Sequence, residues 1–161
     1  MNIKEFNTCV DDNADGVYRF ILKNIKDEEK AKDIVQDSFE KMWIKVKEIS
    51  FEKAKTYLYT TAYHTMIDLI RKDSRKTFFE NVHQNLFTCE NSYSDLKEVL
   101  DEAVDKLPEI QRSVLLLRDY EGYSYEEIGG ITGLNESQVK VYIFRARNYL
   151  KSYIGSVETL I

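Results

Sequence analysis

At 161 residues, with 32% of them charged and a net charge of −5, the chain is long enough for one domain or two small ones. No apolar stretch is long enough to span a membrane, no secretory leader is visible, and Cys9 and Cys89 lack metal or redox spacing. We therefore expect a cytoplasmic protein without direct membrane insertion. The single proline, Pro108, and the lack of sustained strand-like alternation predict an all-α fold.

Three helices are predicted in the N-terminal half. The first covers Val17–Ile25, after a cap and turn at residues 11–16, and Asp27 can cap the second. The second helix, Ala31–Val46, has a clean amphipathic stripe, and we expect Trp43 in the core. The stripe consists of Ala31, Ile34, Val35, Ser38, Phe39, Met42, Trp43 and Val46.

The third helix is predicted from about Ala54 to Lys72. It buries Leu58, Ala62, Met66 and Leu69 and ends in a basic patch, Arg71, Lys72, Arg75 and Lys76. The stretch that follows, 77–95, lacks a sustained helical period and is rich in Asn, Ser and Thr. We predict a flexible linker at residues 77–97, between an N-terminal domain at residues 1–76 and a C-terminal domain at residues 98–161. Its apolar residues suggest that it packs on something: Phe78, Phe79, Leu86 and Phe87.

Residues 124–154 have the pattern of a helix-turn-helix. Ser124 and Glu127 can form a capping box, which starts one short helix, and Gly133 suits the left-handed residue that ends it. Asn135 and Gln138 can start the next helix, from about Glu136 to Ile154, by the same capping logic.

The faces of that last helix differ in character. At 100° per residue, a narrow buried face is formed by Val139, Ile143, Ala146 and Leu150. The opposite face and its flanks carry Ser137, Gln138, Lys140, Val141, Phe144, Arg145, Arg147, Asn148 and Lys151. The cations alone would be typical of a solvated helix face. A large aromatic residue away from the buried stripe indicates a partner, and cations serve phosphates and guanine edges, so we predict DNA binding in the major groove.

Charge is segregated along the chain. Residues 98–127 contain nine acidic and three basic side chains, whereas residues 136–151 contain four basic and one acidic. Two small basic patches on an acidic body predict weak, salt-sensitive DNA binding by the free protein, because phosphate contacts dominate DNA affinity. The chain is therefore expected to need a larger partner on DNA.

Two blocks of sequence resemble a known family. The run Asp33–Phe39, then Met42-Trp43, Tyr57–Tyr59 and Ile67-Asp68, is similar to the first DNA-binding domain of a sigma factor. The block from Leu107-Pro108 to Arg147 is similar to the second domain of that family. Both blocks in this order, over roughly residues 6–75 and 98–154, identify the chain as resembling an extracytoplasmic-function (ECF) sigma factor.

The resemblance implies that the protein binds core RNA polymerase, directs it to promoters and assists opening of the duplex. The implied polymerase contacts are Asp33, Gln36, Asp37 and Glu40. The implied contacts to the −10 element are Tyr63, His64, Arg71, Lys72 and Arg75, with the loop at residues 48–53 beside them. The implied contacts to the −35 element are Ser137, Gln138, Lys140, Val141, Phe144, Arg145 and Arg147. Further implied partners are promoter DNA itself and an anti-sigma factor.

Two departures from the family pattern affect these roles. Where the family often has Arg-Asn, this chain has Tyr63-His64, so His64 either holds a flipped base differently or is a polar residue without a special task. Where the family commonly has Lys or Arg, then Ser, then Arg in the reading helix, the chain has Lys140-Val141-Tyr142. The −35 sequence is therefore not transferable from relatives.

Other kinds of protein share parts of this pattern. A self-sufficient helix-turn-helix regulator would bind duplex DNA tightly alone, and a pure interaction protein would bind polymerase without promoter selectivity. Residues 11–16 match the opening of an EF-hand, but position twelve is Leu22 instead of a bidentate glutamate. We expect no enzyme activity, metal or cofactor, and a monomeric free protein whose two domains pack together and hide part of the DNA-binding surface.

Overall fold

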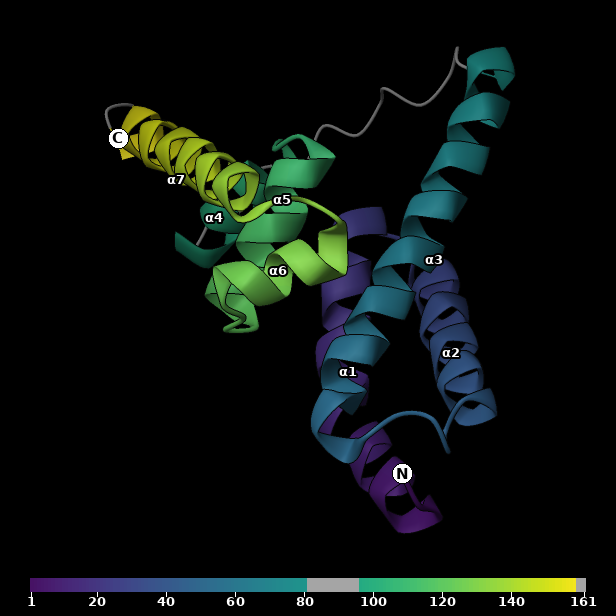
Figure 1. The fold of residues 1–161 in the computed structure, drawn as a ribbon. Coiled ribbons are helices and arrows are strands. Elements are labelled where there is room, and N and C mark those ends of the chain that lie inside the picture. The colour runs from purple at the N-terminus through teal and green to yellow at the C-terminus, as the bar shows by residue number, and fades with distance from the viewer. Residues whose placement is uncertain (81–95, 159–161) are drawn as a thin grey trace.

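The computed structural model describes residues 1–80 and 96–158, and within them it contains helices and no strand. This confirms the predicted all-α fold. Two helical units lie side by side (Figure 1). The N-terminal unit comprises α1 (Ile3–Ile25), α2 (Glu28–Ile44) and α3 (Phe51–Glu80). The C-terminal unit comprises α4 (Leu96–Asp105), α5 (Glu109–Leu115), the π-helical turn η1 (Leu116–Tyr120), α6 (Tyr125–Thr132) and α7 (Glu136–Glu158).

The N-terminal unit is a three-helix bundle in which each helix packs on the other two. Its centre is filled from all three helices by Phe20, Ile21, Met42, Leu58 and Met66, each at most 1% exposed. Asp27 caps α2 as predicted, since its carboxylate accepts a hydrogen bond from the Lys30 backbone N–H. The predicted stripe of α2 is buried at five of its eight positions: Ala31, Ile34, Val35, Ser38 and Met42.

The C-terminal unit is organised around α7, which packs on α4, α5 and α6. The continuous helix formed by α5 and η1 contributes an unbroken run of buried residues, Ser113–Leu117. In η1 the hydrogen bonds reach five residues back, so Glu121 N–H donates to Leu116 O. This wider turn ends the helix and leads into the loop at residues 121–124.

Three expectations about the N-terminal half are wrong. Residues 11–16 are not a cap and turn, because α1 runs unbroken from Ile3 and is anchored by buried Cys9 before Val17. The third helix is longer than predicted and continues to Glu80, so the expected linker at 77–97 falls mostly outside the described residues. Trp43 is not in the core: it is 47% exposed and packs edge-on against Phe6, with ring centroids 5.0 Å apart.

The two units share one continuous set of buried apolar residues. Helix α6 packs on α3, and α5 packs on α1, as Figure 1 shows where α6 leans toward α1 and α3. The two units are therefore packed against each other in this structure, as expected.

Candidate nucleic-acid and protein interfaces

Local capping sets the geometry of the helix-turn-helix. The Ser124 hydroxyl accepts from Glu127 N–H at 3.1 Å, and the Glu127 carboxylate accepts from Ser124 N–H at 3.3 Å. Gly133 ends α6 in a left-handed conformation with φ of 81°. The Asn135 and Gln138 side chains exchange the same pair of bonds at the start of α7, at 2.8 and 3.1 Å. The sequence prediction for this turn is confirmed.

Helix α7 buries one face and presents the other to solvent. Val139, Ile143 and Ala146 are at most 2% exposed, while Leu150 is half-buried. On the opposite side Phe144 is 66% and Val141 44% exposed. The predicted contacts on this outer surface are all exposed: Ser137, Gln138, Lys140, Val141, Phe144, Arg145 and Arg147.

The cations on this face differ in their neighbours. Lys140 pairs with Glu136 one turn away, at 3.4 Å between exposed groups, and such a pair contributes little. Arg147 makes two bonds to Asp119 of η1, at 2.6 and 3.2 Å, and the bonded carboxylate raises the pKa of its guanidinium. Arg147 therefore ties α7 to η1, in addition to any role at a phosphate.

On α3 the predicted nucleic-acid residues separate into two groups. His64, Arg71 and Lys72 are exposed, whereas the side chain of Arg75 lies outside the described residues. Tyr63 is only 5% exposed, and burial, followed by the Glu109 carboxylate of the C-terminal unit, raises the pKa of its phenol. Tyr63 is thus withdrawn from solvent in this arrangement of the two units.

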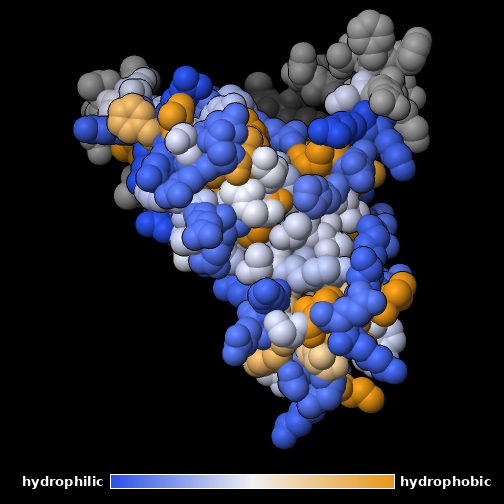
Figure 2. Space-filling model, in the orientation of Figure 1, coloured by the Kyte–Doolittle hydropathy of each residue, from blue (hydrophilic) through white to orange (hydrophobic). Residues whose placement is uncertain are grey.

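The predicted protein-binding residues line the outer side of α2. Asp33, Gln36 and Glu40 are exposed, and half-buried Asp37 pairs with Lys41 at 3.0 Å. Beside them runs an open groove of about 710 Å³ between α1 and α2. Figure 2 shows hydrophobic residues at the surface near the lower end of the N-terminal unit. Trp43 and the 80% exposed Ile44 line the groove.

Comparison with known proteins supplies the family. The model of the family described as Sigma-70 region 2 matches residues 9–76, and that of Sigma-70, region 4 matches residues 97–150. The ECF RNA polymerase sigma factor SigM of Bacillus subtilis is 30% identical over 84% of this chain and 86% of its own length. The sigma factor SigV of the same organism is 31% identical over 89% of this chain and 87% of its own.

This chain belongs to the ECF sigma factor family. Solved structures agree with the fold of the sigma factor. This chain superposes with a TM-score of 0.80 on RpoE from Bartonella quintana, which was solved in complex with the anti-sigma factor NepR. The two are 24% identical, and the match covers 95% of this chain and 98% of RpoE. The chain superposes with a TM-score of 0.70 on CnrH, solved with the cytosolic domain of CnrY, at 19% identity over 96% and 90% of the two chains.

The region 2 match covers α2 and most of α3, and the region 4 match ends at Leu150 of α7. The structure of the sigma factor thus separates its candidate residues onto three surfaces, on α2, α3 and α7. Among the described residues no helix is long and apolar enough to cross a membrane.

Sequence reasoning misses several residues at the surfaces of the sigma factor. Ile44 is exposed and does not belong to the predicted apolar stripe of α2. An isoleucine outside that stripe, next to Trp43, could have predicted an apolar contact surface. Glu121 and Tyr123, in the loop after η1, contact α3, where Tyr59 donates to Glu121 and packs on Tyr123. No local pattern indicates those contacts, because their partners lie about 60 residues away in the chain.

Proposed function

We propose that this sigma factor divides promoter recognition and polymerase binding among three helices. Helix α2 binds core RNA polymerase, α3 engages the −10 element, and α7 reads the −35 element. The supporting observation is that the two region matches fall, in this order, on units whose candidate contact residues are largely exposed. The associated domain division is an N-terminal domain at residues 1–76 and a C-terminal domain at residues 98–161, with α3 and α4 extending a few residues into the segment between them.

The α7 surface suits recognition in the major groove. Lys140 and Arg145 offer donors for base edges and phosphates, and Phe144 and Val141 offer apolar surface for a thymine methyl. Ser137 and Gln138 lie in the first turn, where helix N-terminal residues of such motifs approach the bases. The proposed reading residues are therefore those on the exposed face of α7.

The α3 surface suits an opened strand. Arg71 and Lys72 are exposed cations near the end of the described part of the helix and can follow a phosphate backbone. His64 and Tyr63 can stack on or hydrogen-bond an unpaired base, and their rings lie 5.7 Å apart edge to face. Tyr63 must be uncovered before it can do so.

The α2 surface suits a large protein partner. Two exposed polar side chains, Gln36 and Glu40, line a groove that also holds exposed Trp43, so polar residues border an apolar centre. Asp33 is exposed on the same helix. A solved relative carries an anti-sigma factor. We propose that polymerase and an anti-sigma factor compete for this surface, and that the protein works in the cytoplasm and leaves the chemistry to polymerase.

Capture of core polymerase by variants of α2 tests this assignment. Asp37→Lys reverses a charge on the proposed surface and is expected to weaken binding of core polymerase about tenfold, which would lower transcription from every promoter. Gln36→Ala is expected to weaken polymerase binding less. Asp11→Lys is the matched control, because Asp11 is an exposed acidic residue that lies on α1 and not on the proposed surface of α2. Equal capture by Asp37→Lys and the wild type, measured by fluorescence anisotropy, would refute the assignment of α2.

A further inference from the structure

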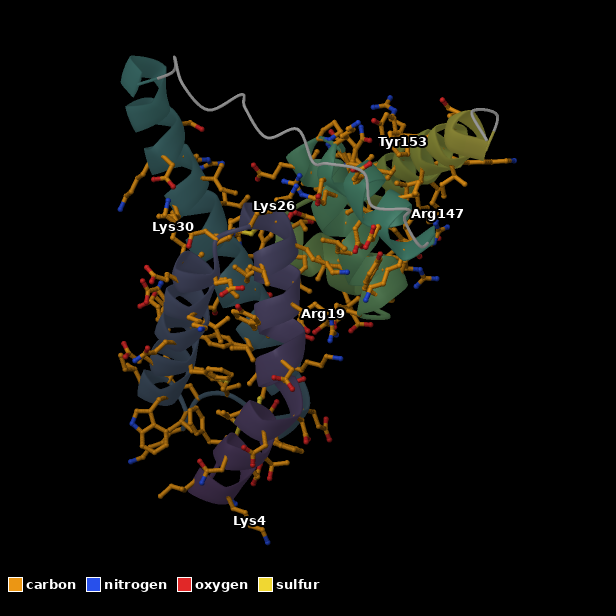
Figure 3. All side chains as sticks on the ribbon, turned by 180° about the vertical axis from the view of Figure 1, so that it is seen from behind. Lys4, Arg19, Lys26, Lys30, Arg147 and Tyr153 are labelled. Carbon is orange, nitrogen blue, oxygen red and sulfur yellow. The ribbon has the colours of Figure 1, made fainter. Side chains whose placement is uncertain are left out.

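The interface between the two units is complementary in charge. Helix α1 presents Arg19 and Lys23, and Lys26 caps its end, with spacings of four and three residues that place them on one face. Figure 3 shows Arg19 and Lys26 on the side of α1 that is turned toward the C-terminal unit. Each cation meets a side chain of the acidic segment 98–127: Arg19 Nη2 lies 3.2 Å from Glu121 Oε1, Lys23 Nζ lies 3.9 Å from the Tyr120 ring centroid, and Lys26 Nζ lies 2.7 Å from Asp105 Oδ2.

Glu121 is the most enclosed group among the ion pairs described between the two units. Its side chain is 8% exposed, and its two oxygens have separate partners from the N-terminal unit. Oε1 pairs with Arg19, and Oε2 accepts a hydrogen bond of 2.9 Å from the Tyr59 hydroxyl. A carboxylate withdrawn from water needs such partners, and bonds to charged acceptors are stronger than neutral ones. Separating the units would remove both partners at once.

Aromatic packing surrounds that carboxylate. The Tyr123 ring, 4% exposed and from the same loop as Glu121, packs edge-on against Tyr59 with centroids 5.3 Å apart. Tyr59 itself is 1% exposed. The loop at residues 121–124 therefore inserts one charged and one aromatic side chain against α3.

Gly16 makes room for this contact. A Cβ atom at Gly16 would lie 2.6 Å from Tyr59 Oη and 3.3 Å from Glu121 Oε2, which is too close for the tyrosine hydroxyl. Glycine is a poor helix former, yet Gly16 lies inside the continuous helix α1. The residue is therefore explained by the approach of Tyr59 and Glu121, and not by the cap and turn expected from the sequence.

A second contact lies two turns further along α1. The buried Asn24 side chain accepts from Arg112 Nε at 3.0 Å and from the Ser113 hydroxyl at 3.2 Å, and its backbone carbonyl accepts from Arg112 Nη2 at 3.3 Å. Burial lowers the pKa of the Arg112 guanidinium. The C-terminal unit is thus held at both ends of the α1 face.

Closure covers Tyr63, which is part of the proposed −10 surface of α3, and leaves His64, Arg71 and Lys72 of that surface exposed. Tyr59 and Tyr63 are four residues apart on α3, so they share a face, and both are buried. Tyr59 contacts Glu121 and Tyr123, and Tyr63 lies near the Glu109 carboxylate of α5. The outer face of α7 and the polar residues Asp33, Gln36 and Glu40 of α2 stay exposed. The covered face contains Tyr63, a proposed contact to the −10 element.

We propose that Gly16, Arg19, Tyr59, Glu121 and Tyr123 form an interdomain clasp that holds the free sigma factor closed. The clasp masks the Tyr59–Tyr63 face of α3 from promoter DNA and leaves α2 accessible, so polymerase can bind before the units separate. The masking step rests on the proposed function of α3, whereas the clasp itself does not. The loop at residues 121–124 thus acts as an internal competitor of the −10 strand.

Solution scattering of the full chain tests the clasp. Gly16→Ala, Glu121→Gln and Tyr59→Phe, which keeps the ring and removes the hydroxyl, are each expected to increase the radius of gyration. Loss of a bond to a charged group shifts the closed–open equilibrium about tenfold toward the open form. Gly155→Ala is the matched control, because Gly155 is also a helical glycine but a Cβ atom there would meet no other atom within 4 Å. Circular dichroism confirms that each variant stays helical.

A wild type with well-separated units, or three variants as compact as the wild type, would overturn the clasp.

Masking of α3 is tested with a fluorescent single-stranded oligonucleotide that carries the non-template −10 segment of a mapped promoter. The clasp variants are expected to bind it up to about tenfold more tightly than the wild type. Variants whose two units separate but which bind the oligonucleotide no more tightly would refute the masking of α3 and leave the clasp itself unaffected. If the protein bound to polymerase also failed to bind the oligonucleotide, the proposed contact of α3 with the −10 element would be wrong. The scattering result would still show independently whether the clasp exists.

Discussion

Arg145 and Arg147 are two residues apart on α7 but are not equally available to DNA. Arg147 donates hydrogen bonds from two of its nitrogens to Asp119, so these donors already stabilise the C-terminal unit. Arg145 is exposed and, among the described residues, has no ion-pair partner. Figure 3 shows Arg147 on the C-terminal unit, away from α1. The arginine that reads a base is therefore inferred to be Arg145.

Arg145→Ala is expected to weaken transcription from promoters whose −35 element carries the contacted base and to leave other promoters nearly unchanged. A good bidentate contact to a base contributes about 1–3 kcal/mol of discrimination. Lys151→Ala, an exposed cation nearly two turns beyond Arg145, is the control and should act weakly and uniformly. Transcription from a set of promoters with single −35 changes measures both. Equal loss at all promoters for Arg145→Ala would show that it contacts only phosphate.

Residues with two possible partners are the hardest to predict from the sequence. The period of α3 correctly indicates burial of Leu58, Ala62 and Met66, because that stripe faces its own bundle. It does not indicate burial of Tyr63, which shares its face of α3 with Tyr59, and Tyr59 contacts Glu121 and Tyr123 of the C-terminal unit. Hydrophobicity alone predicts Trp43 in the core, but its position beside Met42 turns it away from the bundle centre.

At the level of single helices, capping patterns give the most reliable predictions. The boxes at Ser124 and Asn135 and the left-handed Gly133 are present as predicted, because each depends on side chains within three residues. The predicted start of α1 is wrong, because the low helix propensity of residues 11–16 is overridden by packing of Cys9 and Val17. Long-range packing of this kind has no local signal.

Ser124→Ala is expected to destabilise the protein by about 1 kcal/mol, since it removes the acceptor for the Glu127 backbone N–H at the start of α6. Urea unfolding followed by circular dichroism measures the free energy of unfolding. Ser124→Asp is the control, because a carboxylate can accept the same bond and should restore most of the stability. An alanine variant as stable as the wild type would mean that the box does not contribute.

At the scale of the whole molecule, the acidic segment 98–127 has a structural explanation that composition alone does not provide. Asp105 and Glu121 pair with cations of α1, so part of the negative charge serves to hold the units together. Exposed pairs such as Lys26–Asp105 contribute about 0–1 kcal/mol and are screened by salt, so the buried Glu121 contacts carry more of the closure. The sequence predicts that the units pack together, but not through which residues.

The same charge distribution explains why the protein is expected to act with polymerase. The net charge of −5 opposes binding of the free chain to DNA, and the basic surfaces are limited to parts of α3 and α7. Polymerase bound at α2 would hold these surfaces on the promoter and favour the open arrangement. Promoter-specific initiation is thus a property of the complex.

The most direct test of promoter-specific initiation is transcription in vitro from fragmented genomic DNA of the source organism, with core RNA polymerase and the purified protein, followed by mapping of transcript starts. We predict defined starts that share two upstream sequence motifs and disappear when the protein is omitted. The absence of specific starts, together with tight binding of duplex DNA by the free protein, would contradict the assignment and indicate an independent regulator.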